Sequence, residues 1–231
     1  MTLLNISPFA ISRWGAFFNH FDLFFKGFLY TLGISFGALL LALILGILSG
    51  GLSTSKSKVG KLISRIYVEV FQNTPLLVQI VFVYYGLAII SNGHVMISAF
   101  FTAVLCVGLY HGAYISEVIR SGIEAVPKGQ TEAALAQGFT ANQTMQLIIL
   151  PQAVRTILPP MTNQVVNLIK NTSTVAIISG ADIMFVAKAW AYDTTNYIPA
   201  FAGAAIFYFV ICFPLASWAR KQEELNKKTY S

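Results

Sequence analysis

Charged residues are scarce in this chain. Asp, Glu, Lys and Arg together make up 10% of its 231 residues, whereas hydrophobic residues make up 56%. A soluble globular domain carries about 25% charged residues. The composition therefore excludes an ordinary soluble domain and predicts an integral membrane protein.

Cysteine is also scarce, and a targeting sequence is missing. The two cysteines, Cys106 and Cys212, lie in apolar runs, where a thiol serves packing more often than a disulfide. The start of the chain lacks a basic stretch followed by an apolar one and a small-residue cleavage site. We therefore expect no cleaved signal peptide.

The usual groupings of catalytic residues are absent as well. The sequence contains no Ser-His-Asp set, no cluster with metal-ligand spacing and no carboxylate pair at catalytic spacing. The string from Gly51 to Ser57 faintly resembles a phosphate-binding loop, but Ser55 stands where the second glycine belongs and no buried strand precedes it. We expect a chain that is not an enzyme and that binds no cofactor or metal itself.

The sequence does contain five long apolar segments. A helix needs about 20 apolar residues to cross a bilayer, so we predict an all-α integral membrane protein with five transmembrane helices. The predicted spans cover residues 23–51, 66–90, 95–119, 156–180 and 197–218. We expect Asn73-Thr74-Pro75 to disturb the second helix near its start, and residues 182–196 to form a polar connection.

The remaining residues complete the predicted organisation. Residues 1–22 include Arg13, Trp14 and several phenylalanines, which predicts an interfacial segment at the membrane surface. Residues 23–219 form the predicted transmembrane domain, with a polar loop over about residues 121–155. Residues 220–231 form a charged tail.

The loop charges predict the orientation in the membrane. One side carries eleven basic residues: Lys56, Lys58, Lys61, Arg65, Arg120, Lys128, Arg155, Arg220, Lys221, Lys227 and Lys228. The other side carries three: Arg13, Lys26 and Lys188. Because basic residues are enriched in cytoplasmic loops, we expect the N-terminus outside, and the C-terminus and the loop at 121–155 in the cytoplasm. The placement of the basic residues beside apolar segments also argues against nucleic acid as a partner.

The predicted cytoplasmic loop carries a motif with strict spacing. Glu-Ala-Ala is followed by a glycine and then by Ile-x-Leu-Pro. The residues are Glu132, Ala133, Ala134, Gly138, Ile148, Leu150 and Pro151. The alanines favour a helix with little bulk, the glycine favours its end, and the proline fits the first turn of a following helix. An ordinary amphipathic helix explains Glu-Ala-Ala alone, but it does not explain the whole spacing.

This motif resembles the EAA loop of bacterial ABC importer permeases. Five spans in this orientation resemble the polar amino acid (glutamine/glutamate/histidine-type) branch of that family. Its further motifs here are Gln72-Asn73-Thr74-Pro75-Leu76, Ala113-Tyr114-Ile115-Ser116-Glu117, Gly129-Gln130-Thr131 before the Glu-Ala-Ala, and Lys170-Asn171-Thr172-Ser173. Together the motifs cover nearly the whole chain.

The resemblance implies a multi-pass subunit in the bacterial cytoplasmic (inner) membrane, surrounded by membrane lipid. It implies a cytoplasmic coupling helix between helices 3 and 4 that docks on ABC ATPase subunits, where ATP and Mg are bound and ATP is hydrolysed. A second permease subunit, either the same or a related chain, and an extracytoplasmic amino acid-binding protein are the other implied partners.

Polar residues inside the predicted spans are candidates for a substrate path, because such residues usually face a cavity or the bundle interior. On the fourth helix they share one face: Asn163, Asn167, Lys170, Asn171 and Thr174. On the second and third helices the candidates are Asn73, Gln79, Tyr110, His111 and Tyr114. Helix–helix hydrogen bonding is the alternative for the fourth helix, and His111 is either a proton relay or an interior histidine.

Three charged residues near the cytoplasmic ends predict a gate or an ion pair. Glu117 lies close to the end of the third predicted span and has Arg120 and Arg155 as candidate partners. Lys170 lies deep in the fourth, where it either faces the cavity or extends to the outer surface.

The best-supported function is thus a permease for a polar amino acid. The fourth-helix stripe has no carboxylate to hold a cationic side chain, which favours glutamine, glutamate or aspartate. Three alternatives stay open: an ion-coupled secondary amino acid transporter, a permease for a basic amino acid, and a membrane subunit that only anchors partners.

Overall fold

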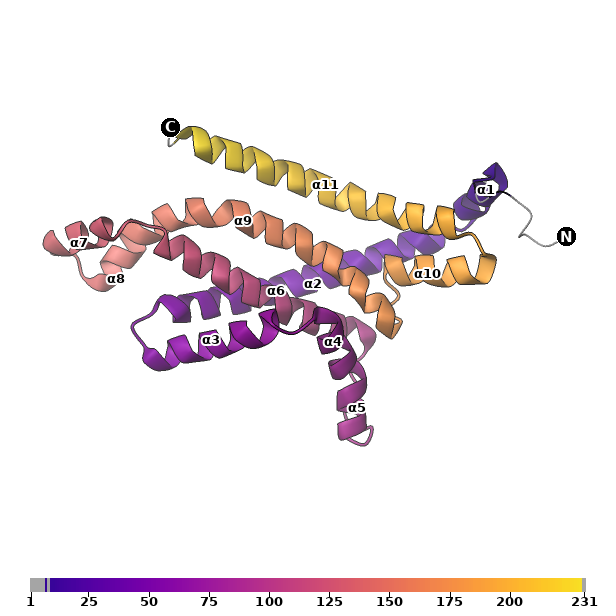
Figure 1. Ribbon diagram of the computed structural model, residues 1–231, viewed down its shortest axis with the longest axis horizontal. Coiled ribbons are helices and arrows are strands. Elements are labelled where there is room, and N and C mark those ends of the chain that lie inside the picture. Colours follow the sequence, from indigo (N-terminus) through magenta and orange to yellow (C-terminus); the bar gives the residue numbers. More distant parts are fainter. Residues whose placement is uncertain (1–6, 8, 230–231) are drawn as a thin grey trace. The chain divides into compact units, whose positions relative to one another are not determined.

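The computed structural model describes the backbone of residue 7 and of residues 9–229, and side chains as far as residue 221. Every regular element in this part of the chain is a helix (Figure 1). In chain order they are α1 (Ile11–Asn19), α2 (Phe21–Thr54), α3 (Lys58–Gln72), α4 (Leu76–Val81), the π-turn η2 (Phe82–Gly86), α5 (Leu87–Ile90), α6 (Ala99–Glu124), α7 (Lys128–Ala136), α8 (Ala141–Gln143), the π-turn η3 (Thr144–Ile149), α9 (Leu150–Asn171), the 3₁₀ segment η4 (Thr172–Ile178), α10 (Ile183–Thr194) and α11 (Tyr197–Thr229).

The prediction of an all-α membrane protein is confirmed. Three of the described helices, α2, α6 and α11, are long and apolar enough to cross a membrane. Up to five spans result if each of two bent helix pairs counts as one span. The first and fifth predicted spans lie inside α2 and α11, and the third predicted span corresponds to α6, which begins four residues later than expected.

The second predicted span is wrong in its start, whereas the expected disturbance at Asn73-Thr74-Pro75 is confirmed. The helix α3 begins at Lys58, eight residues before the predicted start of the span, and ends at Gln72. The chain then bends by 96° before the second helix of the pair, which ends at Ile90. Pro75 explains the break, because it lacks an N–H and its ring clashes with the carbonyl four residues before it. The Asn73 side chain donates to the Glu69 carbonyl over 2.8 Å and so closes the end of α3.

The predicted polar connection at residues 182–196 is wrong, because most of it is helix α10. The buried residues of this helix recur at helical spacing, and they are Ile183, Val186, Ala187, Trp190 and Ala191. Asp182 begins the helix by accepting a hydrogen bond from the Met184 amide over 3.0 Å, as an N-cap residue does. Polar residues at both ends of the segment, together with Lys188 within it, concealed this buried face.

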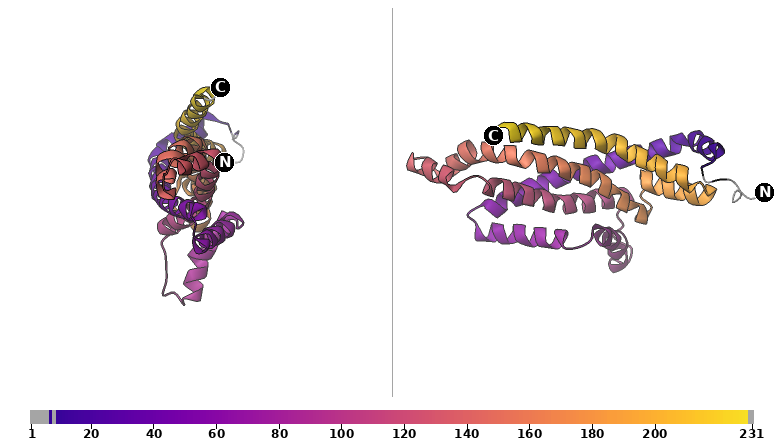
Figure 2. Two further views of the ribbon diagram at one scale, coloured as in Figure 1. Left: turned by 90° about the vertical axis from the view of Figure 1, so that its left-hand side faces the viewer. Right: turned by 45° about the horizontal axis from the view of Figure 1, so that its top comes forward.

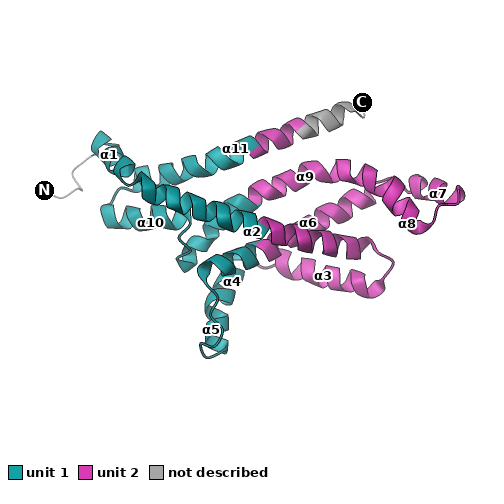
Figure 3. Cartoon of the chain, turned by 180° about the vertical axis from the view of Figure 1, so that it is seen from behind, with its two compact units in different colours: residues 1–38, 76–107, 168–214 teal, residues 39–75, 108–167, 215–231 magenta. Residues whose placement is uncertain are grey.

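The chain forms two compact units, coloured separately in Figure 3. Unit 1 comprises residues 1–38, 76–107 and 168–214. Its aromatic core joins Phe17 of α1, Phe24 of α2 and Trp190 of α10, and ring centroids lie 4.7–6.3 Å apart. Arg13 of α1 donates to the Thr195 carbonyl over 2.8 Å, which ties α1 to the turn between α10 and α11.

Unit 2 comprises residues 39–75, 108–167 and 215–231. Within it, α3 folds back beside the second half of α2 (Figure 2). Glycines let α2 and α6 approach closely, since a Cβ at Gly50 would lie 2.8 Å from side-chain atoms of Ile119. A chain of hydrogen bonds joins all three helices: Ser116 donates to Ser49 over 2.9 Å, and Ser49 contacts Ser64 over 2.8 Å.

Candidate functional site

The Glu-Ala-Ala motif lies in a compact helical loop of unit 2. Its first helix, α7, packs against the π-turn η3, which continues into α9 without an intervening non-helical residue. Thr140 and Gln143 close the start of α8 with a capping box, in which each side chain binds the other residue's amide. The loop is thus a folded element that continues directly into α9.

Gly138 ends α7 in a left-handed conformation. Its φ is +89°, which favours glycine because other residues place Cβ against the carbonyl oxygen. Its amide donates to the Leu135 carbonyl over 3.0 Å, and the Phe139 amide donates to the Ala134 carbonyl over 3.1 Å. These two bonds form a Schellman motif, which satisfies the last carbonyls of the helix.

Replacing Gly138 with alanine is expected to loosen this helix end. An added Cβ meets nothing within 4 Å, so the cost is backbone strain of about 1–2 kcal/mol. The Phe139 amide should then exchange with deuterium roughly tenfold faster or more. Gly129→Ala is the matched control, since its Cβ also meets nothing within 4 Å but lies inside α7, where alanine stabilises the helix. Equal exchange rates in the two variants would contradict this role of Gly138.

The motif residues divide between the surface and the interior of the loop. Glu132, Ala133 and Gly138 are exposed, whereas Ala134 is buried. Ile148 and Leu150 are half-buried, and Pro151 is exposed at the second position of α9. The small size of Ala134 therefore serves packing within the loop, and the exposed Ala133 remains available to another protein. Pro151 does not interrupt the helix, because the wider π-turn η3 precedes it.

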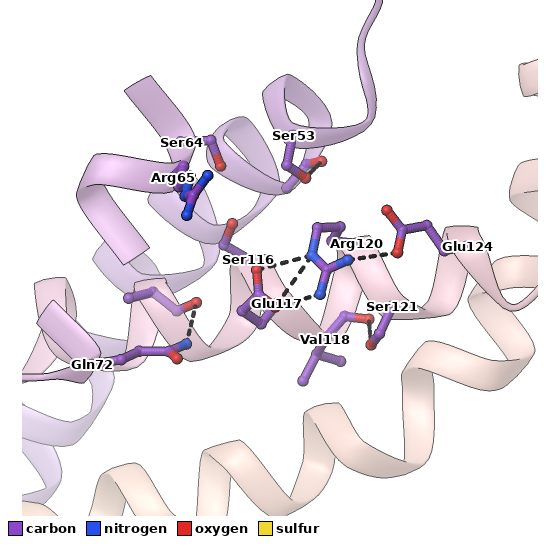
Figure 4. Close-up of polar contacts among 12 residues, drawn as sticks. Ser53, Ser64, Arg65, Gln72, Ser116, Glu117, Val118, Arg120, Ser121 and Glu124 are labelled. Carbon is purple, nitrogen blue, oxygen red and sulfur yellow. Dashed lines mark hydrogen bonds and ion pairs between the residues drawn. The ribbon is translucent and has the colours of Figure 1, made fainter. Parts of the chain in front are cut away.

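Two of the three candidate gate residues, Glu117 and Arg120, form an ion-pair cluster with Glu124 near the end of α6 (Figure 4). Arg120 donates to the Glu117 carboxylate from Nε over 3.0 Å and from Nη2 over 2.7 Å. Its Nη1 also donates to Glu124 over 2.5 Å. The structure thus pairs Glu117 with Arg120, one of the two partners considered from the sequence, while Arg155 is exposed on α9.

The path candidates on α6 lie mostly inside unit 2. His111 is 2% exposed, and its Nδ1 lies 3.4 Å from Oε1 of Gln164 on α9. Tyr110 and Tyr114 approach each other with hydroxyl oxygens 3.2 Å apart. This environment is that of an interior histidine held by neighbouring polar groups.

The candidates on α9 lie largely on its exposed side. Asn163, Asn167 and Lys170 are exposed in this chain, and Asn171 is half-buried. An exposed polar stripe on a membrane helix is costly against lipid, so another protein surface or water must cover it. Within unit 1, Lys170 lines a pocket of about 290 Å³ together with Ser173 and Tyr208.

The two remaining candidates flank the break between α3 and α4. Asn73 is exposed after the end of α3, where its side chain also lies 3.2 Å from the Glu69 carboxylate. Gln79 is half-buried in α4 and belongs to unit 1.

Sequence reasoning missed the polar face of α3. A pocket of about 420 Å³ in unit 2 is lined by α3 together with the ends of α2 and α6. In the sequence analysis, Lys61 and Arg65 serve only as basic residues that predict the orientation in the membrane. The second predicted span begins after them, at residue 66. The three- and four-residue spacing of Lys61, Ser64, Arg65, Val68 and Gln72 was the pattern that could have revealed one helical face.

Comparisons with known proteins identify relatives over nearly the whole chain. Residues 42–224 match the family model described as "Binding-protein-dependent transport system inner membrane component". A probable glutamine ABC transporter permease protein of Bacillus subtilis (strain 168) is 34% identical over 213 residues, covering 92% of this chain and 97% of the relative. A probable amino-acid ABC transporter permease protein of Vibrio harveyi is 36% identical over 200 residues, covering 85% and 89%.

Solved structures show the same fold. A chain from a structure described as an amino acid ABC transporter with histidines has a TM-score of 0.84 and 31% identity, covering 91% of this chain and 97% of that one. A chain of an inward-facing methionine ABC transporter has a TM-score of 0.66 at 18% identity, covering 88% and 98%. The second likeness is one of fold alone.

Proposed function

This chain belongs to the family of binding-protein-dependent transport system inner membrane components, and we propose that it is the permease subunit of an ABC importer for a polar amino acid. The observation that carries the proposal is the near full-length likeness to amino-acid permeases, including a solved one. This chain provides the passage through the bacterial inner membrane, and ATP is hydrolysed on partner ATPase subunits at its cytoplasmic side. A second permease chain and an external amino acid-binding protein complete the importer.

Coupling to the ATPase takes place through the exposed surface of α7. Ala133 and the half-exposed Leu135 lie on this surface, where small and apolar side chains permit close contact with a cleft on a partner. The capped ends of the loop and the packing of α7 on η3 support this role. They keep the docking surface folded when force acts on it.

The loop faces the cytoplasm in this proposal, because eleven basic residues lie on its side of the membrane. A cysteine introduced at Lys128, the first residue of α7, is expected to react with an impermeant thiol reagent only from the cytoplasmic side. One introduced at Asn92, in the turn after α5, should react only from outside. Reaction of the Lys128→Cys variant from outside would overturn both the orientation and the coupling role.

Glutamine, glutamate or aspartate is the proposed cargo. The polar stripe of α9 offers amides at Asn163 and Asn167 and an ammonium group at Lys170, and α9 contains no carboxylate. These groups fit an uncharged or anionic side chain better than a cationic one. The names of relatives from Bacillus and Rickettsia, which refer to glutamine, support the same class.

Two other functions are distinguished by specific observations. A basic amino acid is the second candidate cargo, because the similar solved transporter is described as one with histidines. An ion-coupled transporter would need no ATPase partner, and His111 or Glu117 would couple ion movement. The family membership and the folded coupling loop favour the ATP-driven importer.

Uptake by the complete importer in proteoliposomes, with ATP inside, tests the proposal. We expect uptake of glutamine, glutamate or aspartate to require both enclosed ATP and the external binding protein. Uptake driven by an ion gradient without ATP would establish the secondary transporter. Preference for arginine, lysine or histidine would overturn the assignment of the cargo while leaving the importer intact.

A further inference from the structure

The pocket between α2, α3 and α6 is polar along its whole length. Of the ten residues that line its volume of about 420 Å³, Val68 alone is apolar. Ser53 of α2 and Lys61 lie at one end, and Gln72 and Asn73 lie at the other. The distance along α3 from Lys61 to Asn73 is about 18 Å at 1.5 Å per residue. All of these residues belong to unit 2.

The opposite face of α3 is apolar and exposed. Val59, Ile63, Ile66 and Val70 are 51–67% exposed within this chain, as expected for side chains that meet lipid or another helix. A helix with one apolar and one polar face in a membrane protein directs its polar face to water or to a polar solute. The pocket is therefore a water-accessible site rather than a packing defect.

Positive and negative charges lie together in this pocket (Figure 4). The side chains of Glu117 and Arg120 are each 35% exposed although they are paired. On the α3 side, Arg65 and Glu69 form a second pair at 3.6 Å. With Lys61, the pocket holds three basic side chains and two carboxylates, so it offers partners for both a negative and a positive group of one ligand.

A zwitterion matches this arrangement. Its carboxylate pairs with Arg120 while its ammonium group pairs with Glu117, so one internal ion pair is exchanged for two with the ligand. Glu124, which also binds Arg120, holds the guanidinium group in place during the exchange. A ligand with a single charge can pair with only one of Glu117 and Arg120, so it gains one ion pair instead of two.

We propose that this pocket is a cytoplasm-side binding site for the free amino acid, in which Arg120 binds the α-carboxylate and Glu117 binds the α-ammonium group. The site holds the cargo after it has passed the α9 stripe and before it enters the cytoplasm. Gln72 and Asn73 contribute amides at the inner end for a polar side chain. This assignment rests on the proposed function for its orientation and for the class of its ligand.

Protection of a cysteine at Ser53 tests the site. Ser53 lines the pocket and is half-buried, and the native Cys106 and Cys212 are buried, so wild-type complex gives the background. Inside-out vesicles that contain the complete importer are treated with an impermeant thiosulfonate, with and without glutamine. At a glutamine concentration about ten times the dissociation constant, modification of the Ser53→Cys variant should slow about tenfold.

Two analogues and one control variant make the test specific. Glutaramate lacks the ammonium group and 4-aminobutanamide lacks the carboxylate, and neither should slow the reaction at the same concentration. Lys58→Cys, at the first position of α3 and outside the pocket, should react at the same rate with and without glutamine. Protection of Lys58→Cys as well would indicate a general conformational change and overturn the site.

The charged pair is tested by adding E117Q and R120Q to the Ser53→Cys variant. Modification should continue, and its slowing by glutamine should be lost. Persistent protection, or equal protection by the singly charged analogues, would overturn the recognition by Glu117 and Arg120. If glutamine does not protect Ser53→Cys in a complex that still imports glutamine, the site alone is overturned. If the wild-type importer shows no ATP-driven uptake of any amino acid, the proposed function is overturned.

Discussion

ATP-driven uptake is expected to fall about a hundredfold or more when Ala133 is replaced by tryptophan. Ala133 is exposed on α7, while its neighbour Ala134 is buried against the rest of the loop. A bulky side chain at position 133 therefore leaves the fold of the loop intact and obstructs only the partner. Overpacking a close-fitting interface by this much costs about 3 kcal/mol, which corresponds to about a hundredfold in affinity.

Initial rates of glutamine uptake and co-purification of the ATPase subunits measure this effect together. The matched control is Ala125→Trp, which adds the same side chain at an exposed position of the same region, before α7 begins. The control should retain the ATPase and most of the uptake. If the Ala133→Trp complex assembles and transports at the wild-type rate, α7 does not dock on the ATPase through this surface.

Replacing Asn167 with leucine should reduce uptake about tenfold to a hundredfold. Asn167 is exposed near the middle of the α9 stripe, and its amide both donates and accepts hydrogen bonds. Leucine has the same number of side-chain heavy atoms in a similar branched shape, and it removes both capacities. Loss of a hydrogen-bonded partner for a desolvated cargo costs about 1–3 kcal/mol, which is the origin of the expected range.

The readout must separate transport from assembly. ATPase activity stimulated by the loaded binding protein should persist in the Asn167→Leu complex, because the coupling loop is unchanged. Leu158→Ala is the control, since Leu158 is exposed on α9 but points about 180° away from Asn167 at 100° per residue. Wild-type uptake by Asn167→Leu would move the path away from this face of α9.

The apolar segments predicted the fold class because length and hydropathy alone define a membrane span. These two criteria failed to place helices that carry their apolar residues on one face only. In α3 the charges at Lys58, Lys61 and Arg65 lowered the mean hydropathy, so the second predicted span began only at Ile66. In α10 the polar residues concealed the buried face of Val186 and Trp190. In α3 the periodicity of the side chains was more informative than their mean hydropathy.

The candidate site was predictable in its parts but not in its assembly. The pairing of Glu117 with Arg120 follows from their spacing on one helix. The position of α3 beside α6 depends instead on contacts far apart in sequence, such as the hydrogen bond from Tyr67 to the Leu109 carbonyl over 2.7 Å. No local pattern predicts that register, so the pocket emerged only from the structure.

The continuity of α8, η3 and α9 has a mechanical consequence. From Ala141 to Asn167 the helix is continuous over about 40 Å. The proposed docking surface packs against one end of this helix, and Asn163 and Asn167 lie near the other end. If this helix rotates by about 30° about its own axis, side-chain ends that lie about 5 Å from the axis move by about 3 Å. That displacement exceeds the tolerance of a hydrogen bond. In the proposed importer, torque applied by the ATPase at α7 would break the proposed contacts of Asn163 and Asn167 with the cargo directly, with no relay of intermediate side chains.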